Sequence, residues 1–311
     1  VYNPLPWERG GMVNFVLPSQ GSIKEAYVKE VGTGRIYDLK VYGADSKRLG
    51  TFFAEGIPAN GYKTYILTDE SPAQVENSLK GEEQGNYIEN KWYKVSFDKK
   101  KGCIRSIWDK TNKRELVDDQ SENGFGSYVY ERYDKEQSYR YLKEYIYDKY
   151  KNSHYQITGK STYLDERTKG IHESPRNMEF HVENHKSSIR GVLTPSASVG
   201  EEKHTAGLTV TLYENMPCID VKLSVINKPA TEEPEAGWIA LPFKTKSPEY
   251  RVVRIGSVID PAKDLIEGSQ FNYIWSNSGI MIKDKEYSVG VCPIDAPAFV
   301  LGDLDFMHYA D

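Results

Sequence analysis

Apolar and polar side chains alternate along much of this chain with the period of two that is typical of β-strands. Tyr93, Val95 and Phe97 alternate with polar residues, which predicts a strand with one apolar and one polar face. A short charged turn at 98–102 follows, and the run 103–108 is rich in bulky and β-branched residues that suit a sheet. We therefore predict an antiparallel hairpin here.

The same alternation recurs through the rest of the chain and predicts an all-β protein. Residues 208–212 and 219–225 alternate on either side of a turn at 214–217, which predicts a second long hairpin. The tail 251–300 has further strand candidates between glycines and prolines, without the regular exchange of strand and helix patterns that predicts a parallel sheet.

Turn residues divide the chain into two predicted domains. Glycine, proline and asparagine break residues 1–80 into short strand candidates at the spacing of a small β-sandwich. The polar segment 71–85 contains no strand pattern that could bury a face, and we interpret it as a linker. Since 311 residues are enough for about two domains, we place them at 1–80 and 81–311.

One segment departs from the β pattern. Asp134 and Gln137 have the spacing of a helix capping box, in which each side chain bonds the backbone N–H of the other residue. Leu142, Tyr145 and Ile146 follow at helical spacing. One short helix is therefore expected between two stretches of strand.

Charge and cysteine usage exclude several classes of function. The chain has 40 Lys and Arg residues against 45 Asp and Glu residues, so it lacks the basic surface of a nucleic-acid binder and no nucleic-acid partner is predicted. Its three cysteines are far apart without Cys-x-x-Cys spacing, which argues against a disulfide framework or a zinc knuckle. No apolar run is long enough to cross a bilayer, so no membrane partner is predicted, and the compartment stays open.

Three stretches of the chain carry a resemblance to a known family. The residues Asn-Lys-Trp-Tyr-Lys-Val-Ser-Phe-Asp at 90–98, followed by 102–110 and 114–117, resemble the start of the large β domain of family 38 glycoside hydrolases, the α-mannosidases. Residues 1–9 and 57–65 are similar to the opening and closing segments of the small β domain in that family. The resemblance is close up to about residue 118 and loose beyond it.

This resemblance implies a fold, a reaction class and a missing part. The large domain is expected to be a galactose-mutarotase-like antiparallel supersandwich, and the parent protein a retaining α-mannosidase. The zinc ligands and nucleophilic Asp of that family lie in a catalytic barrel, in motifs such as His-His-Asp that this sequence lacks. We therefore expect no catalytic residue, metal ligand or cofactor in this chain, and zinc in the missing catalytic domain, which is its expected partner.

The histidines of the chain offer two weak candidates for a metal site or an acid–base pair. His181 and His185 have the spacing of a shared metal site on a helix, but the pattern predicts a strand, in which they lie roughly 13 Å apart. His172 and Glu173 are an acid–base candidate for a mutarotase-like sugar epimerase, yet adjacent residues of a strand point to opposite faces.

The segment around Tyr273 resembles the family stretch in which a Tyr of the β domain reaches the sugar. On that likeness Tyr273 is the candidate for contacting a mannoside, with Trp275, Asn272 and Asn277 as further substrate-binding candidates. The likeness departs at Ile274, where the family often has Pro. Tyr273 and Trp275 are also typical of packing residues in an ordinary strand.

Nine tyrosines interleave with charged residues between Tyr128 and Tyr155. Such rings can stack on pyranose faces, which would suit a carbohydrate groove. A tyrosine-rich surface of mixed charge is also typical of a docking interface between domains, and we favour that interpretation.

Together these patterns predict the non-catalytic C-terminal β region of an α-mannosidase-like glycoside hydrolase. We expect it to be a fragment of a longer protein, inactive by itself, that supports and partly lines a carbohydrate site for mannosides. Two alternatives remain, an autonomous carbohydrate-binding module and a mutarotase-like sugar epimerase.

Overall fold

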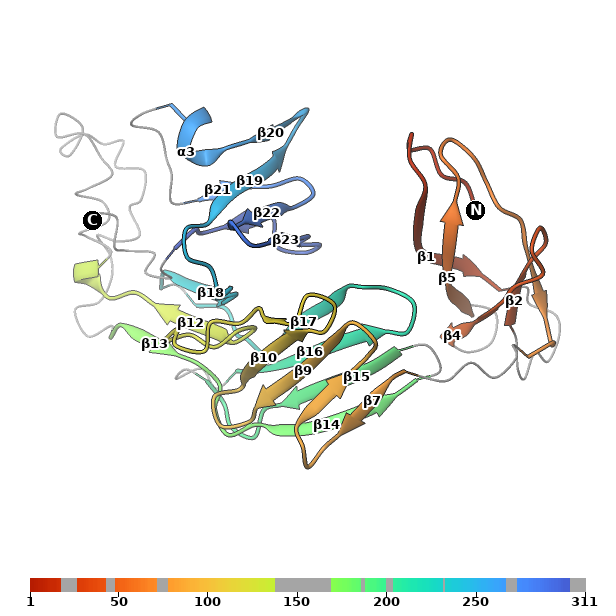
Figure 1. The fold of residues 1–311 in the computed structure, drawn as a ribbon. Helices are drawn as coiled ribbons and strands as arrows, with labels where there is room; N and C mark the ends of the chain where they lie inside the picture. Colours follow the sequence, from red (N-terminus) through yellow and green to blue (C-terminus); the bar gives the residue numbers. More distant parts are fainter. Residues whose placement is uncertain are drawn as a thin grey trace.

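The computed structural model describes residues 1–17, 27–42, 48–71, 78–137, 169–185, 188–199, 204–231, 233–266 and 273–302. Within these residues the chain is built almost entirely of β-strands in several sheets (Figure 1). Neighbouring strands in the named sheets are paired antiparallel, and this confirms the predicted all-β sandwich class.

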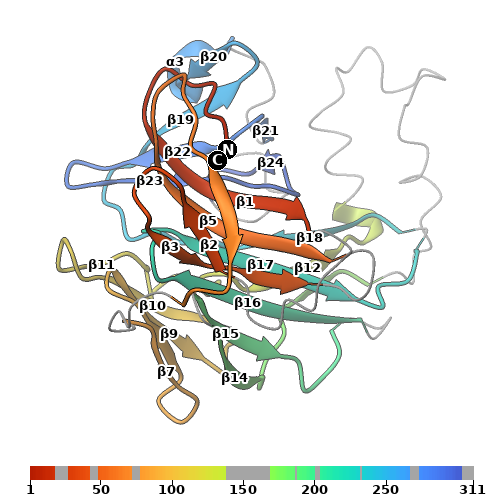
Figure 2. The ribbon, with the colours of Figure 1, turned by 90° about the vertical axis from the view of Figure 1, so that its right-hand side faces the viewer.

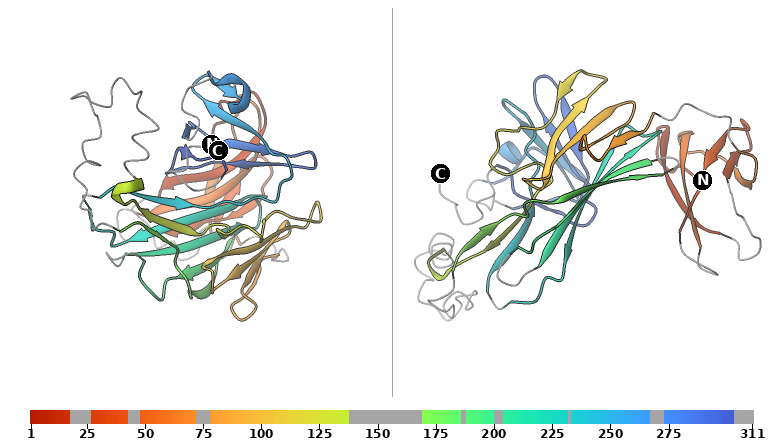
Figure 3. Two further views of the ribbon diagram at one scale, coloured as in Figure 1. Left: turned by 90° about the vertical axis from the view of Figure 1, so that its left-hand side faces the viewer. Right: turned by 90° about the horizontal axis from the view of Figure 1, so that it is seen from below.

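The first six strands form a small two-layered body. They are β1 (Arg9–Val16), β2 (Tyr27–Glu30), β3 (Ile36–Asp38), β4 (Lys40–Tyr42), β5 (Leu49–Ile57) and β6 (Tyr65–Thr68). One sheet has the order β1-β5-β4 and the other β3-β2-β6. Val28, Tyr37 and Phe52 form part of a separate apolar core. This body lies at one end of the molecule, away from the larger sheets (Figures 1 and 3).

Two larger sheets pack face to face in the second body. The first contains β7 (Lys80–Glu82), β8 (Tyr87–Glu89), β9 (Tyr93–Asp98), β10 (Cys103–Asp109) and β11 (Arg114–Glu115). The second contains β14 (Glu179–Asn184), β15 (Ser188–Thr194), β16 (Thr205–Tyr213) and β17 (Ile219–Ile226). Figure 2 shows the yellow and green layers side by side. Their facing apolar side chains share the largest core cluster.

Both predicted hairpins are confirmed. Val95 and Phe97 of β9 are buried, and β9 pairs with β10 across the 98–102 turn, starting from Asp98 opposite Cys103. The turn closes at Gly102, whose φ of 66° is a conformation that favours glycine. The second hairpin joins β16 to β17.

Three smaller sheets complete the described fold. One has the order β13-β12-β18, and another the order β20-β19-β22-β23. A two-stranded sheet pairs β21 with β24. Their bounds are β12 (Tyr128–Arg132), β13 (Ile171–Glu173), β18 (Glu235–Ile239), β19 (Glu249–Arg254), β20 (Ser257–Ile259), β21 (Ile274–Trp275), β22 (Ile280–Lys283), β23 (Ser288–Val291) and β24 (Ala298–Phe299).

The predicted helix capping box is present. The Asp134 backbone N–H donates to Gln137 Oε1 at 2.9 Å, and the Gln137 N–H donates to Asp134 Oδ1 at 2.8 Å. Residues 135–137 are helical, while the apolar positions 142, 145 and 146 lie outside the described residues.

A second helix, α3 (Pro261–Asp264), was not predicted. Asp260 caps it by accepting a hydrogen bond from the Ala262 N–H, and proline occupies its first turn. An acidic cap followed by proline is a sequence pattern for a helix start, so this short element could have been found.

The expected linker at 71–85 is partly wrong. Residues 80–82 form the edge strand β7, paired with β8, while residues 72–77 lie outside the described part of the chain. Gly81 explains why no apolar pattern revealed this strand, since an added Cβ would lie 2.8 Å from Ile189 Cδ1 of the facing sheet. Close backbone approach takes the place of an apolar side chain here.

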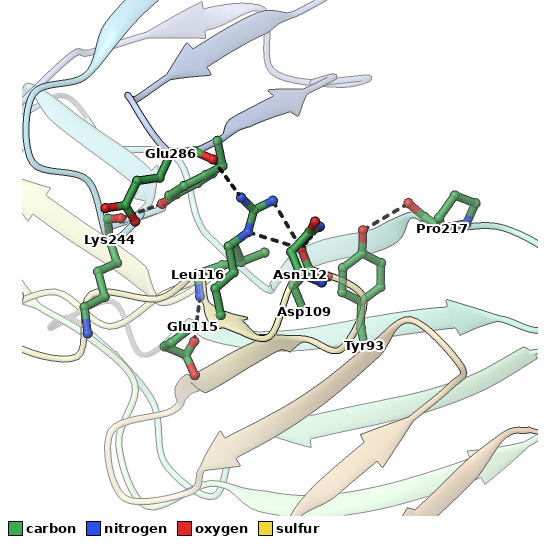
Figure 4. Close-up of polar contacts among 10 residues, drawn as sticks. Tyr93, Asp109, Asn112, Glu115, Leu116, Pro217, Lys244 and Glu286 are labelled. Carbon is green, nitrogen blue, oxygen red and sulfur yellow. Dashed lines mark hydrogen bonds and ion pairs between the residues drawn. The ribbon is translucent and has the colours of Figure 1, made fainter.

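Arg114, at the start of β11, connects the β10–β11 hairpin to the β22–β23 turn through its contacts with Asp109 and Glu286, both labelled in Figure 4. Its guanidinium forms an ion pair of 3.1 Å with buried Asp109 and donates to the backbone carbonyl of Glu286. The same group lies 4.4 Å from the ring centroid of Tyr287, whose hydroxyl donates to the Lys244 carbonyl. One cation therefore connects two sheets that are far apart in sequence.

Candidate functional site

A buried carboxylate, Glu131, is the centre of a polar cluster that includes Trp238, the ring on which the predicted site residue Tyr273 stacks. Glu131 belongs to β12, whose five residues are all buried. A buried carboxylate is costly unless donors surround it, so its partners identify the residues that the fold has organised around it.

The strand register brings these partners to one face of the sheet. Glu131 stands directly opposite His172 on β13, and Val129 stands opposite Trp238 on β18. Because side chains two apart in a strand share a face, Glu131 and Val129 present their side chains on the same side as His172 and Trp238.

Three side chains donate to the Glu131 carboxylate. The Tyr133 hydroxyl and the Trp238 Nε1–H reach Oε2 at 2.7 and 2.8 Å. His172 Nδ1 lies 3.0 Å from Oε1. An ionised carboxylate only accepts hydrogen bonds, so the Nδ1 proton of His172 points to Glu131. We refer to Glu131, Tyr133, His172 and Trp238 as the Glu131 cluster.

Burial and the bond to Glu131 give Tyr133 the properties of a permanent donor. Burial is the larger cause, and the hydrogen bond to the neighbouring carboxylate adds to it, so the pKa of Tyr133 lies far above its ordinary value. Its hydroxyl therefore keeps its proton across the physiological range and holds Oε2 of Glu131 in place.

Tyr273 joins this cluster through an aromatic contact. Its ring stacks on Trp238 with centroids 6.4 Å apart and an angle of 15° between the planes. Trp238 is itself fixed by its hydrogen bond to Glu131. The structure therefore places Tyr273 on a ring whose orientation is set by a buried carboxylate.

The other predicted site residues differ in their exposure. Trp275 follows in β21 and is exposed, whereas Ile274 between them is buried against β19 and β22. The backbone N–H of exposed Asn277 donates to the Val253 carbonyl. Asn272 lies outside the described residues. The structure thus brings Tyr273 to the Glu131 cluster through Trp238, and leaves Trp275 and Asn277 exposed at the surface.

Six of the nine tyrosines of the tyrosine-rich segment lie outside the described residues. Among its described members, Tyr128, Tyr130 and Tyr133 are all buried. Tyr128 and Tyr130 pack on His204 on the face of β12 opposite the Glu131 cluster. For these three tyrosines both a docking interface and a carbohydrate groove are wrong, because their rings are buried inside this chain.

The strand prediction for the two spaced histidines is confirmed. His181 lies in β14 near Glu83 and Glu179, while His185 follows that strand beside Glu183. Within the described residues no three His, Cys, Asp or Glu side chains gather at a metal-binding distance. No described helix combines the length and apolar character needed to span a membrane.

Comparison with known sequences identifies one family. The family model described as glycosyl hydrolases family 38 C-terminal domain matches residues 88–292, about two thirds of the chain. This range includes the β14–β17 sheet, the facing sheet apart from its edge strand β7 and the first residue of β8, and every member of the Glu131 cluster together with Tyr273. No curated protein matches the chain.

Proposed function

This chain belongs to the glycosyl hydrolase family 38 C-terminal domains, and on that premise we propose that it supports and partly lines the carbohydrate site of an α-mannosidase-like enzyme. In this proposal the chain supplies no nucleophile. The zinc and the catalytic carboxylates belong to a separate catalytic domain, and the partner of this chain is that domain with its bound mannoside.

The proposal rests on the two successive contacts that hold the ring of Tyr273 in place. The buried Glu131 carboxylate fixes Trp238, and Trp238 fixes the plane of Tyr273 by stacking. A ring restrained in this way loses less side-chain entropy when it binds a ligand. Pyranose rings carry both C–H faces and hydroxyls, so a preorganised tyrosine beside an exposed tryptophan suits such a ligand.

Oxidative footprinting of the intact enzyme tests this placement. Trp275 and Trp7 are matched probes, because they are 57% and 59% exposed but lie in different bodies of the chain. A bound, slowly hydrolysed mannoside should slow the oxidation of Trp275 several-fold and leave Trp7 unchanged.

Two results would count against the proposal. Equal oxidation of Trp275 with and without a mannoside that saturates the enzyme would place the sugar elsewhere. Tight binding of mannosides by this chain alone would instead favour an autonomous carbohydrate-binding module.

A further inference from the structure

His172 is fixed by one ring nitrogen and open at the other. Nδ1 lies 3.0 Å from Glu131 Oε1, while the side chain is 52% exposed. Among the described residues, Nε2 has no hydrogen-bond partner. Since Nδ1 carries the proton that faces the carboxylate, a neutral His172 presents a lone pair at Nε2.

The orientation of this ring is set by the sheet. Glu131 and His172 are directly opposed in the β12–β13 register, and Oε2 of Glu131 is held from the other side by Tyr133 and Trp238. The carboxylate cannot turn without losing these donors. The imidazole is therefore held at a constant angle, as a histidine is when a carboxylate orients it for chemistry or recognition.

His181 shows what an ordinary exposed histidine looks like in this fold. It lies in β14 with a side chain that is 50% exposed, nearly the same as His172. Its nearest carboxylates, Glu179 and Glu83, are 3.6 and 3.8 Å away and are themselves exposed. Neither distance is a hydrogen bond, so the ring of His181 is not fixed.

We propose that His172 Nε2 accepts a hydrogen bond from a sugar hydroxyl in the same carbohydrate site that Tyr273 lines. This inference rests on the proposed function and extends it, because it adds a polar contact with a defined direction to an aromatic one. Trp238 connects the two contacts. Its Nε1–H donates to the Glu131 carboxylate, which orients His172, and its ring stacks on Tyr273. Glu131 is then a positioning residue, and the ligand class is a pyranoside with a free hydroxyl.

A structural role competes with this proposal, because Oε1 of Glu131 needs a donor whether or not a sugar binds. Two substitutions separate the roles. The side-chain amide of Asn reaches the position of Nδ1, so His172→Asn can keep the bond to Glu131 while removing Nε2. The longer amide of Gln reaches the position of Nε2, so His172→Gln restores a hydrogen-bonding group there.

The experiment measures kcat/KM for an aryl α-mannoside and the thermal unfolding midpoint in the intact enzyme, at a temperature where every variant is folded. His172→Asn should lower kcat/KM by about ten-fold, the loss of roughly one hydrogen bond, with little change in unfolding. His172→Gln should recover part of that loss. His181→Asn is the matched control and should leave both quantities unchanged.

Tyr273→Phe distinguishes a failure of the role proposed for His172 from a failure of the proposed function. If it lowers kcat/KM while His172→Asn stays within about two-fold of the parent enzyme, the role of His172 is overturned and the proposed function stands. If both variants match the parent enzyme, the proposed function fails as well. A His172→Asn variant that is less stable yet fully active would show that His172 serves only the buried carboxylate.

Discussion

Gly191 of β15 lies against the ring of Phe97 from the facing sheet, so closely that an added Cβ would be 2.5 Å from Cζ of Phe97. The Phe97 ring packs on Phe180 with centroids 4.6 Å apart, in the centre of the largest core cluster. The missing side chain of Gly191 therefore makes room for an aromatic pair that joins the two large sheets.

Gly191→Ala should destabilise the protein by about 2 kcal/mol, because the methyl group must displace a packed ring. Denaturant unfolding measures the change. Gly290→Ala in β23 is the control, since an added Cβ there has no atom within 4 Å. That variant should be neutral or slightly stabilising. Equal effects of the two substitutions would contradict the packing described for Gly191.

The small body depends on a buried charge pair. Glu30 is buried, accepts a hydrogen bond from the Tyr37 hydroxyl at 2.9 Å and pairs with Lys63 Nζ at 3.1 Å. Burial alone would raise the pKa of Glu30, but the bonds from Lys63 and Tyr37 and the charge of Lys63 outweigh it. The net pKa is below the ordinary value of 4.5.

This pair predicts an acid-dependent loss of stability. Because the folded pKa of Glu30 is lower than the unfolded one, its contribution is present above pH 4.5 and is lost as pH falls from there through the folded pKa. Lys63→Met should lower the free energy of unfolding by about 2 kcal/mol at neutral pH, because it leaves the buried Glu30 carboxylate with one donor fewer.

Unfolding curves at neutral and acid pH provide the check. Lys29→Met is the control, because Lys29 pairs with Glu70 on the surface at 2.8 Å and should cost less than about 0.5 kcal/mol. A Lys63→Met protein as stable at neutral pH as the control variant would refute the role of the pair.

The two bodies are proposed to be separate folding units. The boundary expected between residues 80 and 81 would cut β7, so we place it before Ser78. The polar segment between them ends at Ser78, whose backbone N–H and hydroxyl both donate to Glu214 of the second body. Limited proteolysis should therefore cut between residues 71 and 78 and spare β7. First cleavage inside either sandwich would argue against this boundary.

The purified chain is predicted to show no turnover of an aryl α-mannoside, even with added zinc. Retaining hydrolysis requires two carboxylates on either side of the glycosidic bond, and we place these in the catalytic domain. Turnover that disappears when a residue of this chain is substituted would contradict the proposed non-catalytic role.

Local sequence patterns were enough to predict much of the fold. The alternation in β9 and β16, the turn at Gly102 and the Asp134 capping box all act over a few residues, and the structure confirms each of them. The edge strand at Gly81 was missed, because its stability comes from contact with the facing sheet and not from its own side chains.

The Glu131 cluster could not be predicted in the same way. Its members come together only through the register of three strands, with His172 41 positions and Trp238 107 positions from Glu131. A pairing shifted by one residue would turn Glu131 to the other face, and nothing local fixes that register. Tyr273 was found by family resemblance alone, while the support behind it emerged only from the fold.

The most direct test of the central claim is Tyr273→Phe in the intact enzyme, measured as kcat/KM for an aryl α-mannoside beside the thermal unfolding midpoint. Tyr250→Phe in β19 is the control, since Tyr250 is a half-buried residue that packs against the apolar cluster of Val252, Ile274 and Ile280. If Tyr273 lines the sugar site, its variant should lose about ten-fold or more in kcat/KM with a nearly unchanged midpoint, and the control should keep its activity. A lowered midpoint with unchanged kcat/KM would contradict the account and leave this chain as scaffold alone.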